Sequence, residues 1–162
     1  MLFSLTDVIL IIIVLIFVIG GFVMGLIQAI GALIGVVAGA WIGGIYFMPF
    51  GEWLTPYVLG HSGVAKVIAF VIIFGLINRL IGLLFWLIEK AFHLISIIPF
   101  LKSINRLGGV LLGFVEGVLI TGLVIYMIVT FAGEIEWLVT ALNESRIAHL
   151  LVWTTQFLSN MI

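Results

Sequence analysis

The sequence has very little charge: Asp, Glu, Lys and Arg make up 8% of its 162 residues, against 65% hydrophobic residues. A soluble domain carries roughly 25% charged residues, because water must solvate its surface. Six basic and seven acidic side chains are too few to solvate a globule of this length. The composition therefore excludes an ordinary soluble domain and indicates that lipid surrounds most of the chain.

Several groups that carry chemistry are also missing. There is no cysteine, which excludes disulfides, thiol nucleophiles and cysteine-ligated metals. The three histidines, His61, His93 and His149, lie in separate segments without the spacing of metal ligands. No nucleophile-elbow or phosphate-loop motif is present, and a net charge of −1 without a basic stripe argues against nucleic acid. We therefore predict no enzymatic activity and no cofactor.

Long apolar runs are what the sequence does have. No charged residue occurs between Val8 and Gly51, and a helix needs roughly 20 apolar residues to cross the ~30 Å hydrocarbon core. The N-terminus has no basic residue before its apolar run, so we interpret this run as a retained span and not as a signal peptide. The pattern predicts an all-α, polytopic bundle of four transmembrane helices plus a C-terminal amphipathic helix, with residues 1–162 forming one membrane domain. The predicted spans are residues 7–23, 26–45, 64–88 and 107–131.

The connections are predicted from turn formers and polar residues. Gly20, Gly21 and Gly25 place a tight turn between the first two spans, because glycine tolerates positive φ. Residues 46–63 contain two prolines and several aromatics and are predicted to be a loop. Residues 89–104 are predicted to be an interfacial segment that Pro99 interrupts.

The tail, residues 134–162, is more polar than the rest of the chain. A helix is expected to start at residues 143–145, after which apolar residues recur at helical spacing. We predict an amphipathic helix on the membrane surface. A fifth crossing stays open as an alternative, although Arg146 and His149 would be costly to bury in lipid.

Basic residues near span ends indicate the orientation of a membrane protein. Lys90, Lys102 and Arg106 all lie between the third and fourth spans. This third loop is therefore predicted to be cytoplasmic, and with four spans both termini are predicted to lie outside. Asp7 and Lys66 both begin spans on the outer side, and we interpret them as solvated helix ends.

Two glycine series with a spacing of four residues occur in the spans. The second span carries Gly31, Gly35, Gly39 and Gly43, and the fourth span carries Gly109, Gly113 and Gly117. This spacing places each series on one helix face, where bare backbones can approach closely in lipid. The pattern predicts helix–helix contacts, either within one chain or between copies in a homo-oligomer.

Polar residues inside the spans form a candidate intramembrane site of Arg79, Glu116 and Asn78. The third and fourth spans are antiparallel, so Arg79 and Glu116 are expected at similar depth, and we predict an ion pair between them. Gly75 and Gly82 share a face with Arg79, which predicts that this face is closely packed. The pair could simply lock two helices, Arg79 could extend to the headgroups, or the site could lie on an ion or solute path.

The order of these landmarks resembles the colicin V production protein family of bacterial inner-membrane proteins. The resemblance rests on the following features: an Asp that opens the first span, the turn containing Gly21, Phe22, Gly25 and Leu26, the run Asn105 to Gly117, and the segment Glu144-Ser145-Arg146-Ile147. It implies four spans, an inner-membrane location and a link to colicin V production or export and to envelope homeostasis. Family members often have a basic residue where this chain has Met24 and Glu116, and a proline where it has Ala148.

The resemblance carries no established catalytic residues onto this chain. It favours a non-enzymatic protein accessory to toxin production, secretion and envelope homeostasis. The alternatives are a small ion- or proton-coupled transporter or channel that uses Glu116 and Arg79, and a lipid-sensing system built on the tail and residues 89–104. The expected partners are membrane lipids, and either further copies of the chain or an envelope or secretion protein.

Overall fold

The computed structural model describes residues 4–92 and 99–156, and all regular structure in this part of the chain is helical. The elements are α1 (Leu5–Met24), α2 (Leu26–Leu54), the 3-10 helix η1 (Thr55–Val58), α3 (Ser62–Phe92), α4 (Pro99–Phe131), α5 (Glu136–Asn143) and α6 (Arg146–Thr154). Four segments are long and apolar enough to cross a membrane: Leu5–Met24, Leu26–Val58, Ser62–Ile88 and Ser103–Phe131. The predicted all-α fold with four spans is confirmed.

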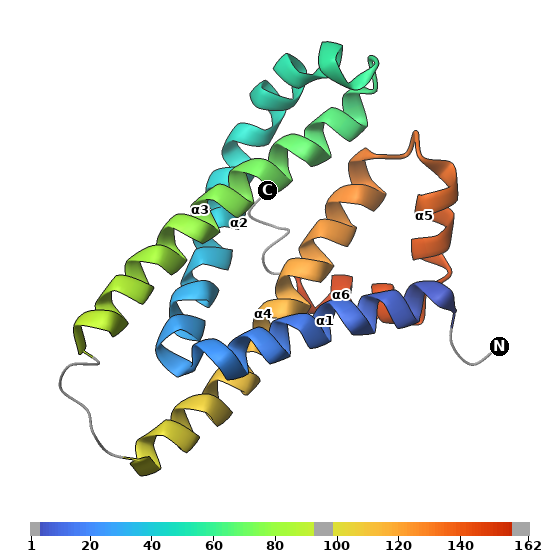
Figure 1. The fold of residues 1–162 in the computed structure, drawn as a ribbon. Helices are drawn as coiled ribbons and strands as arrows, with labels where there is room; N and C mark the ends of the chain where they lie inside the picture. Colours follow the sequence, from blue (N-terminus) through green and yellow to red (C-terminus); the bar gives the residue numbers. More distant parts are fainter. Residues whose placement is uncertain (1–3, 93–98, 157–162) are drawn as a thin grey trace.

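Helices α2 and α3 form a long antiparallel hairpin, and α4 runs beside α2 (Figure 1). Helix α1 crosses α4 obliquely, and the short helices α5 and α6 turn back from the end of α4 towards the start of α1 (Figure 1). We call the end of the bundle that carries the α1–α2 turn, Lys90 and Arg106 the basic end, and the end that carries the α2–α3 connection the opposite end.

The turn between α1 and α2 is shorter than predicted. Gly20 and Gly21 are helical, and the chain reverses at Gly25 alone, which has a φ of 87°. Only glycine adopts this backbone without strain. The Gly25 amide still donates to the Gly21 carbonyl oxygen at 2.8 Å, so α1 keeps its hydrogen bonds up to the reversal.

The predicted loop at residues 46–63 is wrong over most of its length. Helix α2 continues through Pro49 to Leu54, although proline removes one hydrogen bond from a helix interior. Beyond it, Gly51 lies so close to Lys66 of α3 that a methyl group on Gly51 would be 2.8 Å from Lys66 Cα. Packing against α3 therefore extends the helix past the apolar run that defined the span.

The boundaries predicted at residues 89–104 also change. Helix α3 continues to Phe92, and α4 begins at Pro99, because proline fits the first turn of a helix, where its missing N–H is not needed. The described part of residues 89–104 is therefore helical and continuous with α3 or α4. His93 lies outside the described residues.

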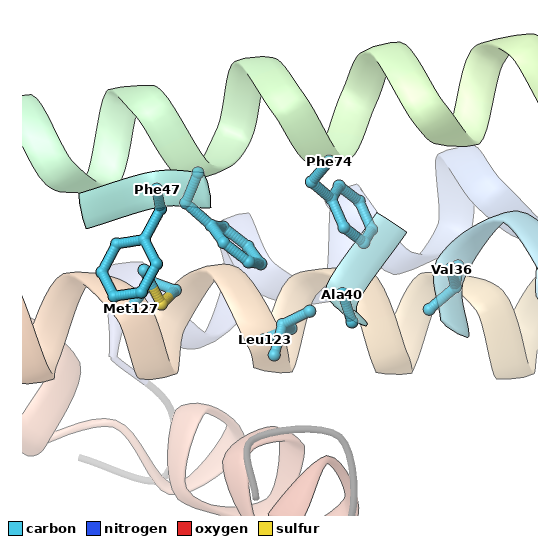
Figure 2. Close-up of a cluster of buried hydrophobic side chains, with 7 residues drawn as sticks. Val36, Ala40, Phe47, Phe74, Leu123 and Met127 are labelled. Atoms are coloured by element: carbon cyan, nitrogen blue, oxygen red, sulfur yellow. The ribbon is translucent and has the colours of Figure 1, made fainter. Parts of the chain in front are cut away.

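The main core joins α2, α3 and α4 (Figure 2). It consists of Val36, Ala40 and Phe47 of α2, Phe70 and Phe74 of α3, and Leu123 and Met127 of α4. The Phe47 ring meets the Phe70 ring edge-on, with 6.4 Å between centroids. This core lies towards the opposite end of the bundle, away from the α1–α2 turn.

The tail forms two helices instead of the one predicted. Helices α5 and α6 are 8 and 9 residues long, far shorter than the roughly 20 residues that a crossing requires, so neither makes a fifth span. A second apolar cluster joins them to the bundle, with Leu10 and Val14 of α1, Ile125 of α4, Leu142 of α5, and Ala148 and Leu151 of α6. The tail therefore packs on α1 and α4 and is not only a surface helix.

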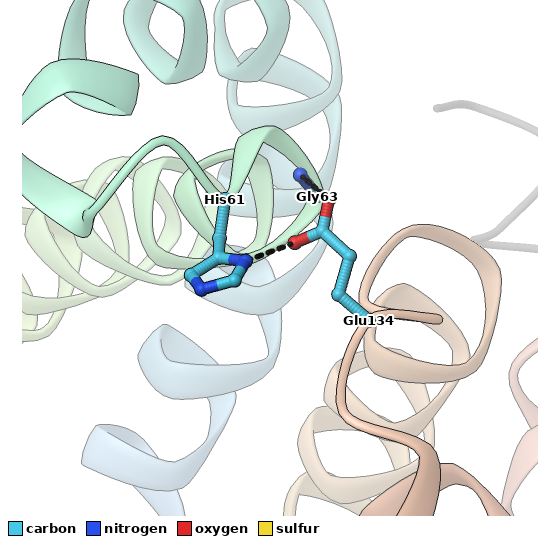
Figure 3. Close-up of polar contacts among 3 residues, drawn as sticks. All are labelled: His61, Gly63 and Glu134. Atoms are coloured by element: carbon cyan, nitrogen blue, oxygen red, sulfur yellow. Dashed lines mark hydrogen bonds and ion pairs between the residues drawn. The ribbon is translucent and has the colours of Figure 1, made fainter.

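One ion pair is present among the side chains that the structure describes. His61 Nδ1 lies 3.5 Å from Glu134 Oε2, and Glu134 Oε1 accepts a hydrogen bond from the Gly63 amide at 3.4 Å (Figure 3). The contact joins the α2–α3 connection to the end of α4. Both side chains are more than a third exposed, at 57% for His61 and 38% for Glu134, so the pair stabilises this junction by about 1 kcal/mol or less.

Candidate functional site

A cavity of about 560 Å³ lies between the helices on the side of the basic end. Four polar side chains line it: Gln28 of α2, Asn78 and Arg79 of α3, and Glu116 of α4. The remaining lining residues are apolar or small: Met24, Ala32, Gly75, Gly82, Leu83 and Trp86. The three residues of the sequence-derived site therefore share one cavity, together with Gln28, which the sequence argument had not included.

The α2 glycines determine how α3 presents its polar residues. Gly31, Gly35, Gly39 and Gly43 face Phe85, Asn78, Phe74 and Phe70 of α3, respectively. A methyl group on Gly35 would lie 3.1 Å from Asn78 Cα, so the two backbones are in close contact at this level. Arg79 follows Asn78 and is rotated by about 100° around the helix, which directs it away from α2 and into the cavity wall.

Glu116 is positioned in the same way by the glycines of α4. Gly113 and Gly117 pack on Phe17 of α1, and a methyl group on Gly117 would lie 2.8 Å from Phe17 Cβ. Glu116 precedes Gly117 and is therefore rotated by about 100° from the α1 contact. This rotation turns its side chain towards the space between α1, α2 and α3, where it is half-buried.

The predicted ion pair between Arg79 and Glu116 is not formed. Within the described part of the chain, the pair at His61 and Glu134 is the one with N···O below 4.0 Å. Helices α3 and α4 share the core near the opposite end, but towards the basic end the start of α2 lies between them (Figure 1). Equal depth along two antiparallel helices therefore did not bring these side chains into contact.

The face of α3 around Arg79 is also open, whereas the sequence predicted close packing. A methyl group on Gly75 or Gly82 would meet no atom within 4 Å. Both glycines line the cavity. The two glycines therefore leave open space in the cavity, and no neighbouring helix packs on them. The prediction that this face is closely packed is wrong.

The glycines of α4 mark its crossing with α1. Gly109 lies against Gly21 and Gly25, and Gly113 lies against Gly21. A methyl group on Gly109 would overlap the Gly21 carbonyl oxygen. Both glycine series are thus covered by helices of the same chain, so a homo-oligomer would have to form through other surfaces.

Asn105 holds the α1–α2 turn, a role that the sequence argument missed. Its side-chain Oδ1 accepts a hydrogen bond at 3.0 Å from the Leu26 amide, the first residue of α2. Helix N-termini leave amides without intrahelical partners, and here a side chain from α4 supplies the missing acceptor. The only sequence signal was the place of Asn105 at the start of the run that ends at Gly117.

Asp7 has a role that contradicts its interpretation as a solvated helix end. It is only 3% exposed, and it closes a capping box with Ser4, whose amide donates to Asp7 Oδ2 at 2.8 Å. Its other oxygen accepts from the Ser145 hydroxyl at 2.5 Å and from the Ile147 amide at 3.1 Å. One carboxylate therefore satisfies the N-termini of both α1 and α6.

The landmarks that were separate in the sequence meet in pairs in the structure. Gly21 meets Gly109, Gly25 meets Asn105, and Asp7 meets the segment that begins α6. Among residues 4–92 and 99–156, no three His, Cys, Asp or Glu side chains come together as metal ligands would. The arrangement is that of a bundle in which polar and glycine residues hold the helices together, and the cavity around Arg79 and Glu116 stays open.

Comparison with known proteins identifies one relationship. A family model described as colicin V production protein matches residues 6–156. No curated protein and no solved structure matches the chain. The matched region contains every contact described above between α1, α4 and α6.

Proposed function

The chain belongs to the colicin V production protein family, and from this premise we propose that it is a non-enzymatic accessory protein of the bacterial inner membrane. In this role it supports toxin production or secretion and the maintenance of the cell envelope. The family is not a known enzyme family. The proposal matches a helical bundle in which four helices are long and apolar enough to cross a membrane.

The use of the polar side chains is the observation that carries this proposal. Asp7, Ser145 and Asn105 bind helix N-termini, so these polar side chains serve contacts between and within helices. The cavity holds the remaining intramembrane charges, and the apolar core of Figure 2 lies between it and the opposite end. A continuous ion path through Arg79 and Glu116 has no comparable support.

Deletion and complementation test the proposal. In a bacterium that encodes this chain and exports a colicin-type toxin, deletion should lower the toxin released per cell and raise envelope permeability to a dye or detergent. The wild-type chain should restore both. Unchanged toxin release and unchanged permeability in the deletion strain would contradict the accessory role.

We also propose that the α3–α4 connection is cytoplasmic and that both termini lie outside, because Lys90, Lys102 and Arg106 all flank this connection. Single cysteines test this directly, since the natural chain has none. A membrane-impermeant maleimide should label Glu144→Cys in spheroplasts, whereas Ser103→Cys should react only after permeabilisation. The reverse pattern would invert the proposed orientation.

A further inference from the structure

The cavity at the basic end holds two opposite charges that do not neutralise each other. Arg79 and Glu116 both line it, and among the described residues neither forms an ion pair. Arg79 lies nine residues before Ile88, where the apolar part of α3 ends, or about 14 Å along the helix. An unpaired charge at such a depth is costly, so a ligand carrying both signs would be strongly favoured here.

We propose that this cavity binds the zwitterionic headgroup of an aminophospholipid, with the phosphate on Arg79 and the ammonium on Glu116. A guanidinium binds phosphate through two parallel N–H donors, and a carboxylate accepts hydrogen bonds from an ammonium group. The two side chains line the same cavity without forming an ion pair with each other, so each can bind one end of a dipolar group. Asn78 lines the same cavity and adds an amide group next to it.

The headgroup chemistry follows from the signs of the two charges. An anionic lipid would satisfy Arg79 but place its negative charge in a cavity that also contains the Glu116 carboxylate. A choline headgroup has the correct charges, but its quaternary nitrogen has no N–H to donate. An ethanolamine headgroup supplies a phosphate and an ammonium with three N–H donors, and it is the one that complements both side chains.

The position of the cavity favours a lipid over a soluble zwitterion. Its lining includes Met24 and Leu83, which are exposed apolar side chains on a surface that faces lipid. Trp86 also lines it and lies two residues before Ile88, at the level where tryptophan anchors helices in the interface. A lipid could therefore place its headgroup inside while its chains remain against the apolar surface. A volume of about 560 Å³ is within the range of roughly 300–1,000 Å³ for small-molecule sites.

Gly75 and Gly82 give the cavity its space and provide a way to close it. A methyl group at either position meets no atom within 4 Å, so a leucine there can fill the cavity without displacing a helix. Gly20 is a matched control, because a methyl group there also meets nothing within 4 Å but the residue does not line the cavity. Comparing a leucine at Gly82 with a leucine at Gly20 therefore separates the loss of the cavity from the general effect of a larger side chain.

The test is native mass spectrometry of the full-length protein after reconstitution into nanodiscs with equal amounts of phosphatidylethanolamine, phosphatidylglycerol and phosphatidylcholine. The wild type should retain phosphatidylethanolamine at least tenfold over each of the other two lipids. Arg79→Gln, Glu116→Gln and Gly82→Leu should each reduce this retention at least tenfold, and Gly20→Leu should leave it unchanged. Glu116→Gln should also reduce the preference over phosphatidylglycerol, since it removes the repulsion against an anionic lipid.

Several results would overturn the proposal. Equal retention of phosphatidylethanolamine and phosphatidylglycerol by the wild type would mean that Arg79 attracts any lipid phosphate. An unchanged preference of Glu116→Gln for phosphatidylethanolamine would show that Glu116 does not bind the ammonium group. Because this variant preserves side-chain size, its result can be interpreted even if Gly82→Leu does not fold. Displacement of the retained lipid by millimolar soluble phosphoethanolamine would assign the site to a free zwitterion instead.

Discussion

Replacing Gly21 with alanine should destabilise the bundle by roughly 3 kcal/mol, whereas the same change at the adjacent Gly20 should not destabilise it. A methyl group on Gly21 would overlap the Gly109 carbonyl oxygen and lie 3.0 Å from Gly113 Cα. These are backbone atoms, so no side-chain rotation can relieve the contact and α1 must move away from α4. A methyl group on Gly20 meets nothing within 4 Å, and alanine favours helix by up to about 1 kcal/mol over glycine.

Thermal or SDS-induced unfolding in one detergent, followed by circular dichroism, measures both variants on the same scale. Gly109→Ala should resemble Gly21→Ala, because its methyl group would overlap the Gly21 carbonyl oxygen. If Gly20→Ala and Gly21→Ala unfolded at the same point, the close crossing of α1 and α4 would be refuted. Gly20→Ala is a matched control for Gly21→Ala, because the two residues are consecutive in the same helix and only Gly21 faces α4.

The number and order of the spanning helices could be predicted because lipid imposes a simple requirement on length and polarity. The helix ends could not, since they depend on neighbours. Helix α2 runs nine residues beyond its predicted end at Ile45 because α3 packs against it as far as Gly51. A hydrophobic run indicates where a span can lie, and it carries no information on a helix that packing against a partner extends further.

The candidate site could be predicted in composition but not in geometry. Asn78, Arg79 and Glu116 do share one cavity, but Arg79 lies exposed on its open side, which the sequence pattern did not indicate. The predicted ion pair is absent, because equal depth brings two side chains together only where their helices are adjacent, and α3 and α4 are not adjacent at this level. In the structure the beginning of α2 lies between them, held there by Asn105 at the Leu26 amide.

The contact between the two ends of the chain lay beyond any sequence pattern. Asp7 and Ser145 are separated by 138 positions, and each also fits a common local role as a helix cap. A capping role within its own helix was enough to explain each residue, so the sequence offered no reason to expect a bond between them. The burial of Asp7 at 3% and of Ser145 at 0% shows that these caps are shared between helices.

Asp7→Ala should release α6 from the bundle and lower its stability by roughly 3 kcal/mol. The carboxylate accepts three hydrogen bonds, from the Ser4 amide, the Ser145 hydroxyl and the Ile147 amide, and bonds to a charged group contribute about 1.5–3 kcal/mol each without being additive. Asp7→Asn should cost less, about 1–2 kcal/mol, because its remaining oxygen can still accept from the start of α6, while its amide nitrogen cannot accept from Ser4.

Hydrogen exchange of the full chain in detergent, read over residues 136–156, separates this local release from global unfolding. In Asp7→Ala the amides of α5 and α6 should exchange much faster than in the wild type, while α2 and α3, which do not contact Asp7, keep their protection. Glu144→Ala is the control, since Glu144 is exposed and directly precedes Ser145. It should leave exchange in the tail unchanged.

A double-mutant cycle of Asp7→Ala with Ser145→Ala then measures the bond itself. Two residues that touch couple by about 0.5–3 kcal/mol, whereas independent sites add. We expect the double variant to be less destabilised than the sum of the single variants by at least about 1 kcal/mol, because Ser145 loses its acceptor once Asp7 is gone. Strict additivity would mean that the Asp7–Ser145 bond does not stabilise the bundle, and the tail would then be held by the bond from the Ile147 amide to Asp7 and by the apolar contacts of Leu142, Ala148 and Leu151.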